Sequence, residues 1–196
     1  MSAIPAFEIG IWNAWIFMVW LVIQTLVVSL TRKALSGKTS RSSETSPHPR
    51  MTGKTYQIIS NLSLLNWLAA TFYAIFLPLR LGTPWFYAGL AIFLPGLAIL
   101  AITSVNFTTT PPTEPVTRGS YRYSRHPMYI ALTLIYLGTS IASASWLFLL
   151  FSITMLAMVR TAAGIEERYC LERYGDAYHK YMKRTPRWLA IPGLKG

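Results

Sequence analysis

Long stretches without charge dominate the pattern of hydrophobic and polar positions along this chain. Four of them contain no Asp, Glu, Lys or Arg, and they cover residues 9–31, 55–79, 81–113 and 126–159. A helix needs about 20 apolar residues to cross the roughly 30 Å of hydrocarbon in a bilayer. Each stretch is long enough, so the pattern predicts an all-α integral membrane helical bundle. A large soluble bundle with unusually apolar helices is the remaining alternative.

The last stretch is too long for a single crossing, because one helix over it would measure roughly 50 Å. Small polar residues at 138–145 lie near its middle, and we expect a tight helical hairpin there. Five membrane-spanning helices result, at about 9–30, 56–79, 85–107, 127–141 and 146–163. A cytosolic helical segment, 164–196, follows them, and we expect the whole chain to form a single membrane domain.

The basic residues give this bundle an orientation. The chain has 18 Lys and Arg residues against 7 Asp and Glu, and with five spans only Arg80 falls on the side opposite to all the other basic residues. Cytosolic loops carry the excess of Lys and Arg in multi-pass proteins. We therefore expect the N-terminus outside and the C-terminus in the cytosol, in a prokaryotic inner membrane or the endoplasmic reticulum.

Composition also narrows the function classes. The net charge of +11 alone suits a nucleic-acid binder, but such a protein needs a wetted basic surface, and this chain is 53% hydrophobic. We expect no nucleic acid among its partners, while the oligomeric state stays open. An ion or proton transporter is disfavoured because its path needs ionisable groups inside the spans. Cys170 is the single cysteine, so we predict a packing role for it and no metal site.

The residues that could bind a ligand or catalyse a reaction lie in two polar clusters, 115–129 and 160–188. The hairpin would bring these clusters to the same membrane face. His126 lies at a predicted helix start with Pro127 after it, and Tyr129 follows on nearly the same face. Carboxylates, aromatic faces and arginines together suit the ribose, adenine, sulfonium and carboxylate of S-adenosylmethionine. Without a G-x-G-x-x-G loop, these residues alone indicate only a cytosol-facing ligand pocket.

Three sequence motifs in these clusters resemble those of a known family. The run V-T-x-G-x-Y-x-x-x-R-H-P-M-Y at 116–129, the pair Glu166-Glu167, and R-Y-G-x-x-Y-x-x-Y at 173–181 before a Pro-Arg-Trp ending resemble the isoprenylcysteine carboxyl methyltransferase and phospholipid methyltransferase superfamily. The resemblance covers roughly residues 105–190. It implies an integral membrane enzyme that transfers a methyl group from S-adenosylmethionine to a lipophilic acceptor, leaving S-adenosylhomocysteine, without a metal.

The resemblance also implies roles for individual residues. It places these residues against the cofactor: Tyr123, Arg125, His126, Pro127, Tyr129, Glu166, Glu167, Tyr178 and Tyr181. As catalytic residues we predict Arg160 and Arg173, either of which would orient an acceptor carboxylate near the methyl group. In the family an Arg commonly lies about four residues before the Glu pair, where this chain has Ala162.

Three functions follow from the resemblance. The leading one is carboxyl methylation of an isoprenylcysteine-like substrate. The second is N-methylation of a phospholipid amine, and the third is a non-catalytic membrane scaffold with the same fold. Acceptor identity and the lipid's entry route stay open at this stage.

Overall fold

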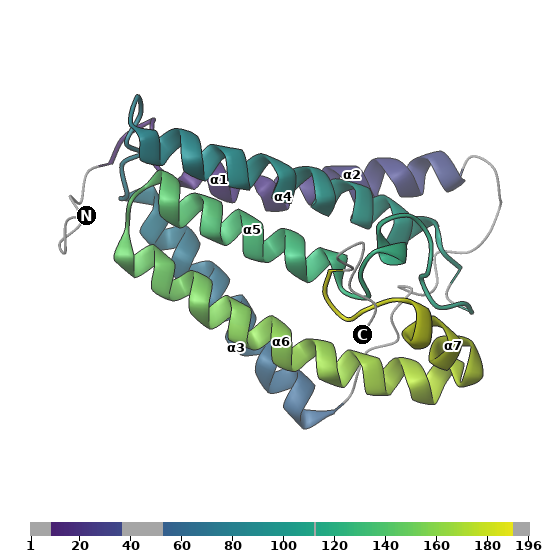
Figure 1. Ribbon diagram of the computed structural model, residues 1–196. Helices are drawn as coiled ribbons and strands as arrows, with labels where there is room; N and C mark the ends of the chain where they lie inside the picture. The colour runs from purple at the N-terminus through teal and green to yellow at the C-terminus, as the bar shows by residue number, and fades with distance from the viewer. Residues whose placement is uncertain (1–8, 37–52, 112, 190–196) are drawn as a thin grey trace.

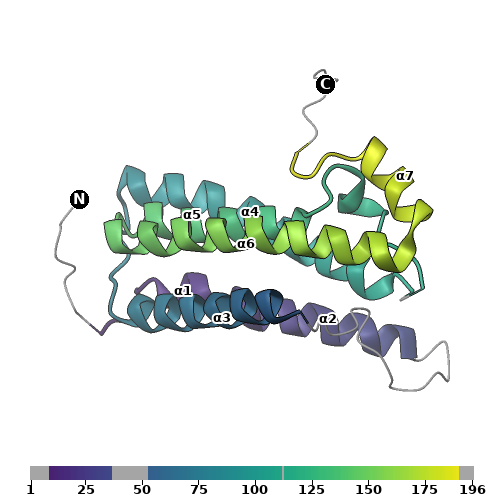
Figure 2. The same ribbon diagram turned by 90° about the horizontal axis from the view of Figure 1, so that it is seen from below.

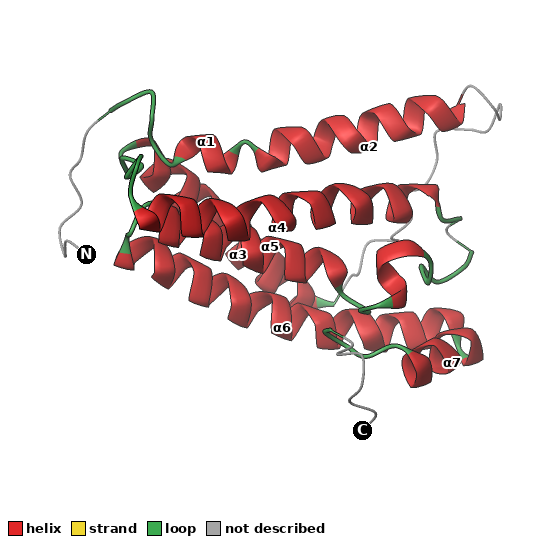
Figure 3. Ribbon diagram, turned by 45° about the horizontal axis from the view of Figure 1, so that its top comes forward, coloured by secondary structure: helices red, strands yellow, loops and turns green. Residues whose placement is uncertain are grey.

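Helices make up nearly all of the regular structure in the computed structural model, which describes residues 9–36, 53–111 and 113–189 (Figure 1, Figure 3). In chain order they are α1 (Trp15–Met18), α2 (Trp20–Ser36), α3 (Lys54–Ile75), α4 (Pro84–Thr109), the 3-10 helix η1 (Gly119–Arg122), α5 (Pro127–Ala142), α6 (Trp146–Tyr174) and α7 (Asp176–Arg184). Within the described residues, four helical stretches are long and apolar enough to cross a membrane, and α5 is a shorter apolar helix. The predicted fold class is confirmed, and the chain is a multi-pass membrane protein.

The helices form two layers, with α1, α2 and α3 in one and α4, α5 and α6 in the other (Figure 2). Within the second layer α4 and α5 approach backbone to backbone. A Cβ atom on Gly138 would lie 2.7 Å from the Phe93 amide nitrogen, and one on Gly89 would lie 2.3 Å from the Ala142 nitrogen. Small residues permit such close packing of helices in a membrane, where apolar burial alone does not drive association.

A turn at residues 143–145 joins α5 to α6 and confirms the predicted hairpin. The Ser145 hydroxyl caps α6 by accepting a hydrogen bond of 3.2 Å from the Phe148 amide. Because of this turn, the start of α5 and the end of α6 lie at the same end of the bundle, together with the end of α2 and with α7 (Figure 1). We call this the α7 end.

Three helix ends differ from the bounds predicted for the spans. The first span begins its helix at Trp15 rather than residue 9, because Ala14 donates to the Leu77 carbonyl at 2.8 Å and Leu79 donates to the Trp12 carbonyl at 3.0 Å. The same pairing ends α3 at Ile75 rather than residue 79. Helix α6 continues past residue 163 to Tyr174, so the last predicted span and the start of the predicted cytosolic segment form one helix. Residues 190–196 of the predicted cytosolic segment lie outside the described residues.

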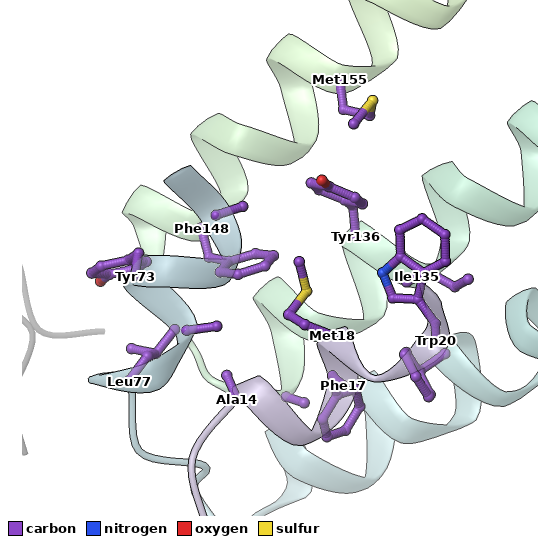
Figure 4. Close-up of a cluster of buried hydrophobic side chains, with 14 of the residues drawn as sticks. Ala14, Phe17, Met18, Trp20, Tyr73, Leu77, Ile135, Tyr136, Phe148 and Met155 are labelled. Carbon is purple, nitrogen blue, oxygen red and sulfur yellow. The ribbon is translucent and has the colours of Figure 1, made fainter. Parts of the chain in front are cut away.

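The apolar core lies at the opposite end, where α1 meets α3, α4 and the hairpin (Figure 4). The rings of Phe17 and Phe93 are 4.4 Å apart, and Phe148 is fully buried. Polar contacts inside the bundle join α3 to α6, since the Thr154 hydroxyl donates to the Asn66 amide oxygen at 2.7 Å. The packing at this end positions the helices that carry the polar cluster at the α7 end.

Candidate active site

The approach to the site is anchored to the end of α4. Gly119 has a positive φ of 60°, and a Cβ atom there would lie 2.1 Å from the Asn106 amide nitrogen. Asn106 Nδ2 donates to Ser120 Oγ at 3.1 Å, and Ser120 Oγ also lies 3.1 Å from Thr103 Oγ1. Only glycine has the freedom and the size for this position. The turn then directs residues 121–126 across the α7 end.

His126 is the N-cap residue of α5 and is buried. Pro127 occupies the first helical position, where the missing amide proton is tolerated. The His126 backbone amide donates to Ser124 Oγ at 3.0 Å, and its ring lies parallel to Tyr129 with 5.5 Å between centroids. These contacts hold the imidazole in one orientation at the base of the site.

Two carboxylates of α6 flank the imidazole. His126 Nε2 is 3.1 Å from Glu167 Oε1, and Nδ1 is 3.6 Å from Glu166 Oε2. Burial alone would lower the pKa of His126, but hydrogen bonds and charge attraction from Glu166 and Glu167 outweigh it and raise the pKa above 6.5. The imidazolium form is therefore favoured between these carboxylates.

Glu167 is buried, and its charge is balanced by three side chains. Arg187 Nε donates to both of its oxygens, at 3.0 and 3.1 Å, while Arg125 Nη1 lies 3.4 Å from Oε1 and His126 contacts the same oxygen. A buried carboxylate is tolerated only with such partners. Glu167 therefore joins α6, the start of α5 and the C-terminal segment at one point.

Further hydrogen bonds attach the C-terminal segment to residues 121–126. The Tyr181 hydroxyl of α7 donates to the Tyr121 carbonyl at 2.7 Å, the Arg125 amide donates to the Pro186 carbonyl at 3.0 Å, and Ser124 Oγ donates to the Arg187 carbonyl at 3.1 Å. These bonds place α7 and residues 185–188 over the polar cluster.

A cavity of about 440 Å³ lies beneath this cover. Its polar part is lined by Arg125, His126, Tyr129, Glu166, Tyr178 and Tyr181. Its other walls come from α2, α3 and α4, and include Val28 and Phe107. Such a volume lies in the range of small-molecule and cofactor sites. One cavity therefore joins a charged end to walls formed by the membrane helices.

Two groups give the polar part its chemistry. Glu166 accepts a hydrogen bond from the Tyr129 hydroxyl and lines the cavity beside His126. Arg125 also lines the cavity, with a side chain 11% exposed, and its buried Nε has no hydrogen-bond partner among the described residues. An unsatisfied buried guanidinium nitrogen is costly, so this atom is suited to an anionic group of a ligand.

The structure brings six of the predicted cofactor residues to the cavity and sets the others apart. Glu167 and Pro127 are buried beside it and do not line it. Tyr123 follows η1 and is 67% exposed, whereas Tyr121 lies within η1 and lines the cavity. The cofactor contact predicted for Tyr123 is therefore not supported by its position.

Neither predicted catalytic arginine lines the main cavity. Arg173 is exposed and lies against the ring of Tyr174, 5.5 Å from its centroid, because its position on α6 points to the surface. Arg160 lines a second, smaller hollow of about 230 Å³ between α5 and α6, where it lies 5.8 Å from the Trp188 ring centroid. Their placement does not bring either guanidinium to the cluster around His126.

Several residues of the site were not predicted from the sequence. Arg187 is the closest partner of Glu167, and Tyr121 lines the cavity. Arg187 belongs to the Pro-Arg-Trp ending that carries part of the resemblance, which is a signal that could have identified it. For Gln24 and Arg32 of α2, which also line the cavity, the sequence offers no comparable motif. Within the described residues no group of His, Cys, Asp and Glu side chains is placed to hold a metal ion.

Comparison with known proteins shows which family the chain is similar to. A family model described as phospholipid methyltransferase matches residues 81–177, which run from before α4 into α7 and include His126, Glu166 and Glu167. The chain belongs to the isoprenylcysteine carboxyl methyltransferase and phospholipid methyltransferase superfamily. Within this superfamily, a protein-S-isoprenylcysteine O-methyltransferase of Schizosaccharomyces pombe is 35% identical over 77 residues. That match covers 39% of this chain and 33% of the relative, so this chain aligns with about a third of the relative's length.

Proposed function

We propose that this chain is an S-adenosylmethionine-dependent membrane methyltransferase that acts on a lipophilic acceptor. The single observation that carries the proposal is the cavity, which joins the cluster of His126, Tyr129 and Glu166 to walls formed by α2 and α4. A water-soluble cofactor reaches the polar part from the α7 end, and an amphiphile reaches the other part from the bilayer. The proposal takes the α7 end as cytosolic, because the basic residues concentrate there.

The residues of the polar part fit this cofactor. Arg125, whose Nε has no partner in the part of the chain that the structure describes, suits the carboxylate. Glu166 suits ribose hydroxyls or an ammonium. Tyr178 and Tyr129 present aromatic faces beside them. Bound S-adenosylmethionine would supply an electrophilic methyl group on a sulfonium. The protein contributes orientation and the exclusion of water by the C-terminal segment that Glu167 and Arg187 hold in place.

For the acceptor we propose the carboxyl group of an isoprenylcysteine-like substrate, in line with the name of the Schizosaccharomyces pombe relative. The second candidate is a phospholipid amine. It is favoured by a specific observation, namely that the carboxylates of Glu114 and Glu166 both line the cavity and suit a cationic headgroup.

Calorimetry with S-adenosylhomocysteine tests the cofactor. Glu166→Gln should weaken binding by about tenfold or more, because a hydrogen bond to a charged group is lost from a buried site. Glu172→Gln is the matched control, since Glu172 lies on the same helix and is exposed. Binding that Glu166→Gln leaves unchanged, or no binding by the wild type, contradicts the proposal.

A methyl-transfer assay then separates the acceptors. Purified protein is given labelled S-adenosylmethionine with a farnesyl-cysteine analogue or with phosphatidylethanolamine, and a base-labile product identifies an ester. Transfer to phosphatidylethanolamine alone supports the second candidate. Cofactor binding without transfer to either lipid contradicts both acceptors and supports a non-catalytic scaffold.

A further inference from the structure

One wall of the cavity comes from a part of the chain that the family match does not include. The match covers residues 81–177, whereas Gln24, Val28 and Arg32 belong to α2. We call these three residues the α2 wall. They line the same cavity as Glu166 and His126, so a part of the chain outside the family match shapes the space in front of the cofactor residues.

The three residues lie on one face of α2 at steps of four positions. Each step rises about 6 Å along a helix, so Gln24 lies about 12 Å deeper than Arg32. Arg32 is the first charged residue after the charge-free run 9–31, which places it at headgroup level. The α2 wall thus begins with the Arg32 cation at the interface and continues along Val28. It ends at the half-buried side-chain amide of Gln24 within the span.

The surfaces opposite the α2 wall suit an elongated molecule. Phe107 of α4 lines the same cavity, and Tyr56 of α3 lines it from the other side. Helix α2 packs on α4, and α3 packs on α6, so α2 and α3 separate toward the α7 end (Figure 1, Figure 2). The cavity therefore extends between two membrane helices at the depth where a lipid tail meets its headgroup.

We propose that the α2 wall is the acceptor subsite and that it selects an amphiphile with a carboxylate at headgroup level. Arg32 pairs with the carboxylate, and the apolar chain lies along Val28 and Phe107. Arg32, rather than Arg160 or Arg173, is then the arginine that positions the acceptor. This assignment rests on the proposed function, because it names the acceptor side of the same cavity.

The test compares binding of a fluorescent farnesyl-cysteine analogue with its carboxamide, in the absence of any cofactor. The wild type should prefer the carboxylate, and Arg32→Gln should reduce that preference by about tenfold, the effect of losing one charge-assisted pair. The matched control is Lys33→Gln, which removes an exposed positive charge from the neighbouring position. A carboxylate preference that survives in Arg32→Gln overturns the proposal.

A second pair of variants tests the path of the chain. Val28→Trp should raise the KM for the farnesyl-cysteine analogue several-fold, because the indole occupies space along the cavity wall, while S-adenosylhomocysteine binding stays unchanged. Val22→Trp adds the same indole to an exposed position of α2 and should alter neither value. An unchanged KM in Val28→Trp overturns the proposal. Loss of S-adenosylhomocysteine binding in the wild type would instead contradict the proposed function, and the carboxamide comparison would still test the α2 wall.

Discussion

At the scale of single residues, the site depends on an imidazole held between two carboxylates. His126 is buried, which opposes its charge, but Glu167 and Glu166 approach its two ring nitrogens at 3.1 and 3.6 Å. Arg187 compensates Glu167 from the opposite side. The charges alternate in sign across the cluster, so removing one member leaves another buried without its partner.

The raised pKa of His126 predicts a pH dependence of stability. A group whose pKa is higher in the folded than in the unfolded state stabilises the fold when it is protonated. This stabilisation is complete at a pH below the unfolded-state pKa, which is 6.5 for His126, and it is lost as the pH rises through the folded-state pKa. We expect the melting temperature of the ligand-free protein in detergent to fall as the pH rises above 6.5 and through the raised pKa of His126. His126→Gln should flatten this fall.

The matched control is His179→Gln, because His179 is exposed on α7. This variant should keep the wild-type pH profile. A profile that is equally steep in His126→Gln shows that another group is responsible.

The sequence predicts the members of this cluster better than their orientation. His126, Glu166 and Glu167 are identified by motif, and the structure brings them together. Which of Tyr121 and Tyr123 faces inward depends on the turn at η1, and that turn depends on Gly119 packing on Asn106, a contact between distant positions. No local pattern encodes such a contact, so the sequence alone does not show that Tyr123 is exposed while Tyr121 lines the cavity.

At the scale of helices, the packing of α4 on α5 fixes the base of the site. Gly138 lies where a Cβ atom would be 2.7 Å from the Phe93 nitrogen and 2.8 Å from the Gly89 oxygen. Both neighbours are backbone atoms, which cannot move without displacing a helix. Because His126 begins α5, a shift of that helix also shifts the imidazole.

Gly138→Ala should therefore destabilise the protein, by roughly 1–3 kcal/mol for overpacking a tight contact. Gly164→Ala adds the same methyl group to α6 at a position with nothing within 4 Å. That control should be neutral or slightly stabilising, because Ala favours the helix by about 1 kcal/mol over Gly. Thermal unfolding in detergent compares the two, and equal effects would rule out the close approach of α4 and α5.

Helix positions could be read from the sequence because the absence of charge over many residues is a strong signal. The predicted fourth span, 127–141, differs from α5 by one residue. Helix ends differ from the predicted span bounds where other interactions decide the end of a helix. Residues 12–14 pair with 77–79, and α6 extends through the charged residues 166–173, where no hydrophobic pattern marks its end.

At the scale of the whole molecule, the hairpin turns two distant polar clusters into one site. Arg80 lies in the connection between α3 and α4, at the end of the bundle opposite α7 (Figure 1). The ends of α2 and α6 and all of α7 lie together at the α7 end. This arrangement predicts that Arg80 and Lys180 face opposite sides of the membrane, with Lys180 in the cytosol.

Single cysteines test this topology, because Cys170 is the only native cysteine. In a Cys170→Ala background, Arg80→Cys should react with a membrane-impermeant maleimide added outside intact cells, since Arg80 is exposed. Lys33→Cys and Lys180→Cys should react only in inverted vesicles, and both positions are exposed as well. Labelling of Arg80→Cys and Lys180→Cys from the same side would require an even number of crossings between them and contradict the five-helix arrangement. The reverse pattern would have Lys33→Cys and Lys180→Cys react from outside intact cells and Arg80→Cys react only in inverted vesicles. It would be consistent with five helices but would place the cavity outside the cytosol, where S-adenosylmethionine could not reach it.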